Sequence, residues 1–204
     1  MHLYQVLAQR VAGWREQGYP HNAYPAIAEI LEWAANPEGS GFCLRRPQVR
    51  ALETYWYLRL VENTPRIRDL YRRLFPKQSE LLAALGLAHD EVREYVLDYG
   101  LDALLERLET DDDLVRRLRL EALRESLTLG YPSYILALAM GAGKTILIGA
   151  IYATEFAMAL EYPDGPFVQN ALVFAPGKTI IESLRELAAA RYDRILPPRL
   201  YKPF

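Results

Sequence analysis

A glycine-rich turn, Met140-Gly141-Ala142-Gly143-Lys144-Thr145, constrains the fold of this chain more than any other stretch of its sequence. The turn comes directly after a continuously apolar run over residues 134–139 and before a segment, 145–160, that is apolar on nearly every side. A short run that is apolar on both sides is typical of a strand buried between helices, and the segment after the turn is typical of a helix packed on a sheet. Residues 134–160 therefore predict a strand, a tight turn and a helix, in that order.

The same succession of elements recurs further along the chain. A second apolar run over residues 171–175 stops at Pro176-Gly177, and an amphipathic helix is predicted over residues 179–190. Strand, helix, strand and helix in this order favour a parallel sheet covered by helices, because parallel strands need crossover connections. The predicted fold class of this part of the chain is therefore α/β.

The chain before residue 131 has a different pattern, in which apolar residues recur at three- and four-residue spacing between short Gly, Pro and Asn interruptions. This spacing predicts helices and requires no strand. The predicted helices cover residues 47–62, 65–75, 79–85, 90–99, 102–109 and 111–127. We therefore predict a helical N-terminal region followed by an α/β region, and the domain boundaries give segments 1–43, 44–130 and 131–204.

The turn has the chemistry of a phosphate-binding loop. Gly141 and Gly143 let backbone N–H groups approach an anion closely, at the positive end of the helix that follows. Lys144 would reach the β- and γ-phosphates of a nucleotide, and the Thr145 hydroxyl would coordinate Mg²⁺. The strict P-loop pattern has glycine where this chain has Leu138, so a tight turn with an incidental Lys-Thr pair is the alternative.

The turn also resembles a known motif. Ala139-Met140-Gly141-Ala142-Gly143-Lys144-Thr145 is similar to motif I of the superfamily 2 helicases, in which A-x-G-x-G-K-T is common. Residues 171–187, ALVFAPGKTIIESLREL, resemble motif Ia of the same proteins. The closest resemblance is to the restriction-subunit type of DEAD/DEAH-box helicase, the group that contains the type III restriction translocases. It implies a RecA-like P-loop domain that binds ATP and Mg²⁺, with Lys144 as the catalytic lysine.

An upstream segment adds to this resemblance. Leu44-Arg45-Arg46-Pro47-Gln48-Val49-Arg50-Ala51-Leu52 is similar to the L-R-P-x-Q-x-x-A-L segment of these helicases, whose glutamine contacts the adenine edge. A carboxamide suits adenine because it offers one donor and one acceptor to N6 and N7. The resemblance implies that Gln48 binds the base, which requires the helices between Gln48 and Lys144 to form an inserted domain. An exposed glutamine at a helix start is the alternative.

Motif Ia contacts the nucleic-acid backbone in this family, so the resemblance gives that role to Gly177, Lys178 and Thr179. Backbone N–H groups, a lysine and a hydroxyl at a helix N-terminus are suited to binding phosphates. A plain helix start capped by Thr179 is the alternative. The implied partner is nucleic acid, DNA rather than RNA, and the family also suggests a modification or nuclease subunit as a partner.

Two parts that ATP hydrolysis needs in this family are not recognisable in the sequence: the DEAD/DEAH carboxylates and the second RecA-like lobe. We therefore expect an incomplete RecA-like domain, the N-terminal part of a helicase or translocase that couples ATP hydrolysis to movement on nucleic acid. Two other functions stay open. One is a P-loop phosphotransferase or signalling NTPase whose helical half binds a partner, and the other is a non-catalytic helical interaction module with a degenerate loop.

Composition narrows the choice further. The formal net charge is −2, from 24 Lys and Arg against 26 Asp and Glu, so nucleic-acid binding would need a local basic patch. The single cysteine, Cys43, cannot form an internal disulfide, and the three histidines have no metal-ligand spacing. The sequence has neither a secretory signal pattern nor an apolar stretch long enough to span a membrane, so we expect a cytoplasmic protein with no membrane partner.

The arginines of the helical region have acidic neighbours. Asp69 lies four residues before Arg73, and Arg117 lies four residues before Glu121. This spacing favours solvated helix faces with ion pairs inside one helix over a basic patch. Three consecutive aspartates, residues 111–113, match the positive dipole of a helix start.

Overall fold

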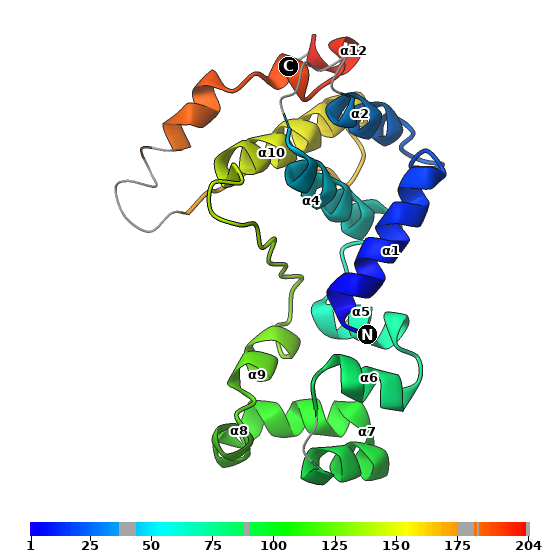
Figure 1. Cartoon of the computed structure of the whole chain (residues 1–204), viewed down its shortest axis with the longest axis vertical. Helices are drawn as coiled ribbons and strands as arrows, with labels where there is room; N and C mark the ends of the chain where they lie inside the picture. Colours follow the sequence, from blue (N-terminus) through cyan, green and yellow to red (C-terminus); the bar gives the residue numbers. More distant parts are fainter. Residues whose placement is uncertain (37–43, 88–89, 175–181, 183, 203–204) are drawn as a thin grey trace. The chain divides into compact units, whose positions relative to one another are not determined.

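The structure, a computed structural model, describes residues 1–36, 44–87, 90–174, 182 and 184–202. Helices form the regular structure of this part of the chain, which contains no strand (Figure 1). The chain divides into two compact units, and neither unit is continuous in sequence. Residues 1–10 and 62–135 belong to the first unit, and residues 11–61 and 136–204 belong to the second.

The predicted α/β fold, with the start of a RecA-like parallel sheet, is wrong for the described residues. Residues 134–139 and 171–174, both predicted as buried strands, have irregular backbone, and residue 175 lies outside the described part. The exposed fraction is 92% for Ile135, 80% for Leu172 and 86% for Phe174. A strand needs a neighbour for its backbone hydrogen bonds, and a continuous apolar run does not supply that neighbour. The described fold is all-α.

Three helices that pack on one another form the second unit: α2 (Ala26–Ala35), α4 (Arg46–Trp56) and α10 (Lys144–Glu161). Small side chains line the buried side of α10, which lets neighbouring helices approach closely. These are Ala150, Ala153 and Ala157 of α10. Large apolar side chains of α2 and α4 fill the remaining space, namely Ile27, Ile30, Leu31, Leu52 and Trp56. Because α10 extends over 144–161, the helix predicted at 145–160 is confirmed.

Shorter elements complete this unit. The helix predicted over 47–62 continues from α4 into one π-helical turn, η1 (Tyr57–Val61). The remaining elements are η2 (Arg185–Ala189), η3 (Tyr192–Arg194) and α12 (Pro198–Tyr201). The helix predicted over 179–190 falls partly outside the described residues, and its end is the 3₁₀ turn η2. Helix α1 (Leu3–Glu16) crosses the division between the two units.

Buried polar contacts fix α4 and α10 in register with each other. The indole N–H of Trp56 donates to the Thr154 hydroxyl at 3.0 Å. The buried carboxylate of the next residue, Glu155, accepts from the Tyr55 hydroxyl at 2.6 Å and from Nε of Arg59 at 2.7 Å. Burial, together with the Glu155 charge, raises the pKa of Tyr55 above its ordinary value. These contacts hold the end of α4 and the turn after it against the second half of α10.

The first unit has a helical core of its own. Its helices are α5 (Ile67–Leu74), α6 (Gln78–Ala84), α7 (Asp90–Thr110), α8 (Asp112–Leu118) and α9 (Glu121–Leu127). Leucines and valines from α6 to α9 form one buried cluster, centred on Val96, Leu104 and Leu108. Gly100 breaks α7 with φ 87° and ψ 169°, in agreement with the two helices predicted at 90–99 and 102–109.

The helix predicted over residues 111–127 is two helices. Arg119, with φ 55°, has left-handed backbone and ends α8, and α9 begins two residues later. Asp111 caps α8 by accepting a hydrogen bond from the Leu114 N–H at 2.8 Å, which lowers the pKa of Asp111. The aspartates of this segment thus occupy a helix start, as predicted.

Pairing inside one helix is confirmed for Arg116, which binds Asp113 at 3.4 Å within α8, but neither of the two pairs predicted from helical spacing is found among the described residues. Arg73 binds Glu62 at 2.8 Å instead of Asp69, and Arg117 binds Glu91 at 2.6 Å. Both contacts join different segments of the first unit, which helical spacing alone does not indicate. No helix in the described part of the chain is long and apolar enough to cross a membrane.

Candidate nucleotide-binding site

The glycine-rich turn enters α10 with both glycines in the left-handed backbone region. Gly141 has φ 72° and Gly143 has φ 75°. Residues with a Cβ avoid this region, which explains glycine at both positions. The Ala142 N–H donates to the carbonyl oxygen of Ala139 at 3.2 Å and closes the turn. The tight turn predicted before a helix is therefore present.

The N-terminal end of α10 presents unpaired backbone donors. The first helical bond joins the Leu147 N–H to the Gly143 carbonyl oxygen at 3.2 Å, so the amides of residues 144–146 precede it. Gly143 stands at the N-cap position and has no side chain to cap them, and the first turn contains no acidic residue. The positive end of the helix dipole is therefore not neutralised by the helix itself, and an anion would be favourable there.

Lys144 folds back over the turn. Its side chain is exposed, and Nζ donates to the carbonyl oxygen of Ala139 at 3.0 Å. The ammonium group is thus held at the mouth of the loop by a neutral acceptor. A phosphate oxygen would form a stronger, charge-assisted bond with the same group, because both partners would then be ionised.

Gln48 lies directly against the loop, although 95 residues separate it from Gly143. The Gln48 side chain is 2% exposed, and its Nε2 donates to the Gly143 carbonyl oxygen at 2.7 Å. Its Oε1 accepts from the backbone N–H of Arg45 at 2.6 Å. Because a backbone N–H can only donate, this contact fixes which side-chain atom is the oxygen. One amide hydrogen and one oxygen lone pair of the carboxamide remain for another partner.

Arg45 makes a second contact between α4 and the loop, which the sequence analysis did not single out. Its Nη1 donates to the carbonyl oxygen of Gly141 at 3.1 Å. Arg45 stands at the N-cap of α4, three residues before Gln48, so both side chains reach the same side. The spacing was therefore a usable signal, because any helix that brings Gln48 to the loop brings Arg45 with it.

Gly143 is required by space as well as by its backbone conformation. A Cβ at residue 143 would lie 2.5 Å from Nε2 of Gln48, which is shorter than any ordinary contact. A Cβ at Gly141 would meet no atom within 4 Å. Gln48 can therefore approach the loop only because residue 143 has no side chain. A side chain at residue 141 would not obstruct it.

Thr145 follows Lys144 in the first turn of α10 and is half-buried. Among the residues described, no group of three or more His, Cys, Asp or Glu side chains is placed to hold a metal ion. The predicted nucleic-acid contacts at Gly177, Lys178 and Thr179 lie outside the described residues.

Comparison with known proteins gives no match: no protein-family model, no curated protein and no solved structure matches this chain. The assignment of a function therefore rests on the residues at the loop and on the motifs that they resemble.

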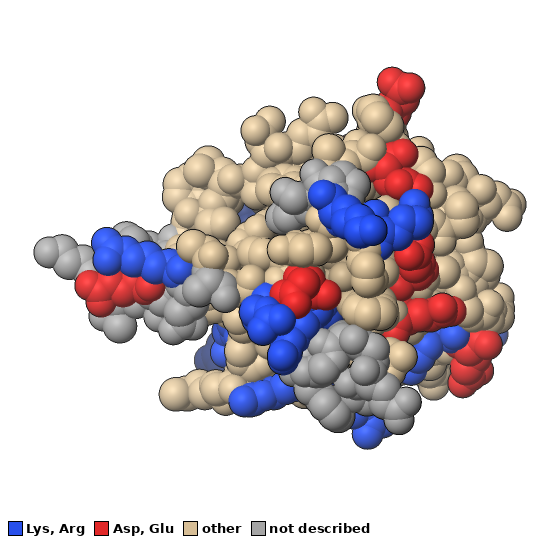
Figure 2. All heavy atoms as spheres, turned by 90° about the horizontal axis from the view of Figure 1, so that it is seen from above, with Lys and Arg blue, Asp and Glu red and all other residues tan. Residues whose placement is uncertain are grey.

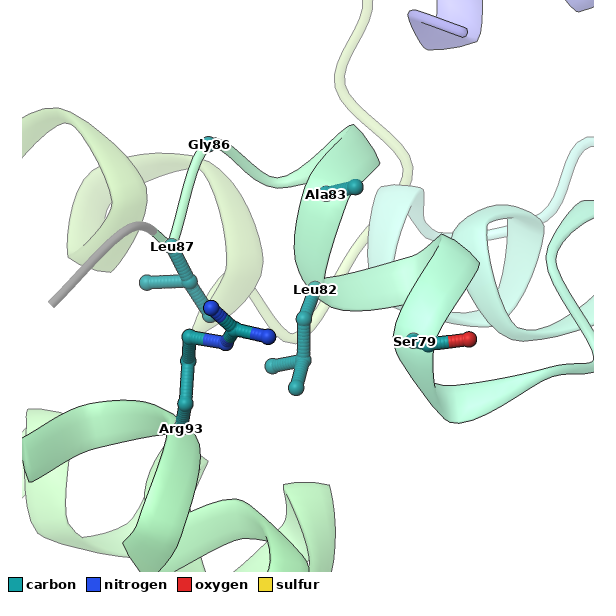
Figure 3. A pocket seen from close by; sticks show the side chains of 6 residues that line it. All are labelled: Ser79, Leu82, Ala83, Gly86, Leu87 and Arg93. Carbon is teal, nitrogen blue, oxygen red and sulfur yellow. The ribbon is translucent and has the colours of Figure 1, made fainter. Parts of the chain in front are cut away.

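A small cavity in the first unit is a second candidate site. It has a volume of about 280 Å³ and is lined by Ser79, Leu82, Ala83, Gly86, Leu87 and Arg93. In Figure 3 the Arg93 guanidinium lies beside the apolar side chains of Leu82 and Leu87. Ligand pockets usually measure about 300–1,000 Å³, so this cavity is small for a nucleotide. The loop before α10 is the stronger candidate site.

Proposed function

We propose that this chain binds ATP with Mg²⁺ at the loop 139–145, as the nucleotide-binding part of a cytoplasmic helicase or translocase that acts on nucleic acid, DNA rather than RNA. The observation that carries the proposal is the hydrogen bond between Gln48 and Gly143. Two segments that separately resemble parts of one ATP site are thereby in contact, although 95 residues separate them. An incidental Lys-Thr pair after a tight turn would give no reason for this contact.

Each residue at the loop has a distinct part in this proposal. Lys144 exchanges the Ala139 carbonyl oxygen for the β- and γ-phosphates, and the free amides at the start of α10 donate to the same phosphates. The Thr145 hydroxyl holds Mg²⁺, which offsets the charge of the phosphates when it is bound. Gln48 offers its remaining donor and acceptor to the adenine edge.

Binding of a fluorescent ATP analogue tests the role of the lysine. We expect Lys144→Ala to weaken binding roughly ten- to a hundredfold, because hydrogen bonds to charged groups contribute about 1.5–3 kcal/mol. Lys77→Ala is the matched control, since Lys77 is an exposed lysine of the first unit paired with Glu80 at 3.1 Å. Equal affinity of wild type and Lys144→Ala would disprove the proposal.

Nucleotide binding by Thr145→Val, measured with and without Mg²⁺, tests the role of Thr145. The substitution keeps the shape of the side chain and deletes the hydroxyl. We expect weaker nucleotide binding than wild type in Mg²⁺, and the same binding as wild type in EDTA, because only the metal-dependent part is lost. A defect of equal size in both buffers would assign Thr145 to the fold instead.

The base preference tests the role of Gln48. Wild type should bind ATP more tightly than GTP, and Gln48→Ala should reduce this ratio. A variant that loses affinity for both nucleotides equally would show that Gln48 supports the loop without binding the base. In the complete protein, stimulation of ATP hydrolysis by DNA would distinguish a translocase from a phosphotransferase or signalling NTPase, which would respond to a different partner.

A further inference from the structure

Helices α4 and α10 both begin beside the loop, and neither has an acidic residue in its first turn. The two helix starts carry cations instead: Arg45, Arg46 and Arg50 at α4, and Lys144 at α10. A cation near a helix N-terminus is unfavourable, because the dipole is positive there. By contrast, α8 begins with Asp112 and Asp113. Departures from a local rule of this kind commonly mark functional sites.

The cations of α4 lie on two different sides of the helix. Arg45 and Gln48 lie on the same side of α4, and both contact the loop. Arg46 and Arg50 are one helical turn apart, and each is two residues from Gln48, which places both on the opposite side of α4. Both arginines are exposed, whereas Gln48 is buried. Arg46 and Arg50 are therefore not available to a nucleotide bound at the loop.

These two arginines have no acidic partner among the described residues, since neither guanidinium makes a hydrogen bond or ion pair there. Arg199, another exposed arginine of the second unit, is by contrast paired with Glu29 at 2.8 Å and with Glu161 at 2.7 Å. On the face that Figure 2 presents, some basic side chains lie beside acidic ones and others do not. Like charges one helical turn apart repel each other, so an external anion would stabilise this pair.

We propose that Arg46 and Arg50 bind the phosphodiester backbone of a nucleic acid on the outer side of α4. Guanidinium groups bind phosphate oxygens through two parallel hydrogen bonds, and the neighbouring helix start adds positive potential. An anionic membrane fits this surface less well, because a helix that binds at a membrane interface needs an apolar face. Among the described residues of α4 no large apolar side chain is exposed.

The inference rests on the proposed function, because it identifies the nucleic-acid partner of the same nucleotide-binding unit. Nucleic acid on Arg46 and Arg50 and nucleotide on Gln48 would bind opposite sides of the same helical turn. Any effect of one ligand on the affinity for the other would be reciprocal.

Fluorescence anisotropy of a labelled oligothymidylate, measured over a range of salt concentrations, tests the site. We expect Arg46→Glu/Arg50→Glu to bind at least tenfold more weakly than wild type. The slope of log affinity against log salt should fall by about 1.4, because each phosphate contact on a single strand contributes about 0.7. Arg116→Glu/Arg117→Glu is the control with the same change of charge, in exposed arginines that have acidic partners. We expect it to retain wild-type affinity.

Two further measurements separate this inference from the proposed function. Circular dichroism checks that the double variant is folded, and its affinity for the fluorescent ATP analogue should stay within about threefold of wild type, whereas Lys144→Ala loses that affinity. Wild-type affinity and salt slope in Arg46→Glu/Arg50→Glu would overturn the inference and leave ATP binding untouched. So would binding of wild type to phosphatidylserine vesicles without binding to the oligonucleotide.

Discussion

The side-chain amide of Gln48 and the backbone N–H of Leu147 donate to the same carbonyl oxygen, that of Gly143, at 2.7 and 3.2 Å. The Leu147 bond is the first of α10, and Gln48 belongs to the first turn of α4. One oxygen atom therefore joins the beginnings of two helices. A change at Gly143 or Gln48 should alter both helix starts and the loop between them.

Replacing either glycine of the loop by alanine should give different results. Gly141→Ala forces a Cβ into left-handed backbone, which costs about 1–2 kcal/mol, but the new methyl group meets no atom within 4 Å. Gly143→Ala carries the same strain and also places its Cβ 2.5 Å from Nε2 of Gln48. We expect an additional loss of roughly 1–3 kcal/mol in the free energy of unfolding for Gly143→Ala, as for other overpacked sites.

The collision itself can be isolated with a double-mutant cycle. In a Gln48→Ala background, Gly143→Ala should cost less than in wild type, because the atom that it meets is gone. The cost of Gly141→Ala should be the same in both backgrounds. Urea denaturation measures all six proteins, and equal costs for Gly143→Ala in the two backgrounds would contradict the contact.

A second prediction concerns the buried ion pair between Arg59 of η1 and Glu155 of α10. Glu155 is almost fully buried, and it also accepts the backbone N–H of Val168 at 2.9 Å. Arg59→Met removes the cation and leaves the carboxylate buried, which should lower the free energy of unfolding by about 3–5 kcal/mol. Lys77→Met breaks an exposed pair and should change stability by less than about 0.5 kcal/mol. Similar effects of the two substitutions in urea denaturation would show that Arg59 is not needed to neutralise Glu155.

The loop and its helix could be predicted from the sequence because their determinants are local. Gly141 and Gly143 mark a left-handed turn, and the apolar character of residues 145–160 indicates a buried helix wherever its partners lie. Gln48 is different, because no periodic pattern links residues 95 positions apart, and only a resemblance between motifs suggested that it belongs to the same site. Arg45 then follows from its helical spacing to Gln48.

Neither the absence of the two expected strands nor the observed ion pairs could be predicted from the sequence. Both depend on partners from elsewhere in the chain. The apolar runs at 134–139 and 171–174 have the composition of strands, but the described residues provide no neighbour for their backbone groups. Arg73 has an acid at helical spacing, yet the folded unit brings Glu62 closer to it. The break at Arg119 was not predicted, because an arginine does not indicate left-handed backbone.

The cap of α8 gives a prediction about pH. Asp111 accepts from the Leu114 N–H, and this bond holds the pKa of Asp111 below its usual value of 3.8. A carboxylate with a lowered pKa in the folded state contributes stability above its unfolded pKa and loses that contribution as the pH falls through its folded pKa. The stability of the first unit should therefore decline in part through Asp111 as the pH falls below about 4.

Asp111→Asn isolates this contribution, because asparagine still caps the helix but does not titrate. We expect wild type to be more stable than the variant at neutral pH and the difference to shrink toward zero in acid, measured by denaturant unfolding at each pH. Asp98→Asn, at an exposed position within α7, controls for a general change of charge. A difference between wild type and Asp111→Asn that is constant with pH would contradict the assignment.

Two helical glycines should respond to alanine with opposite signs. Gly13 lies inside α1, and a Cβ at residue 13 would meet no atom within 4 Å, so Gly13→Ala should stabilise the protein by about 0.5–1 kcal/mol by reducing the freedom of the unfolded chain. Gly100 breaks α7 with φ 87°, so Gly100→Ala should destabilise it by about 1–2 kcal/mol through backbone strain, although open space surrounds it too. Thermal unfolding of the two variants compares them directly. Stabilisation by Gly100→Ala would mean that residues 90–110 form one continuous helix, without the break that separates its two halves.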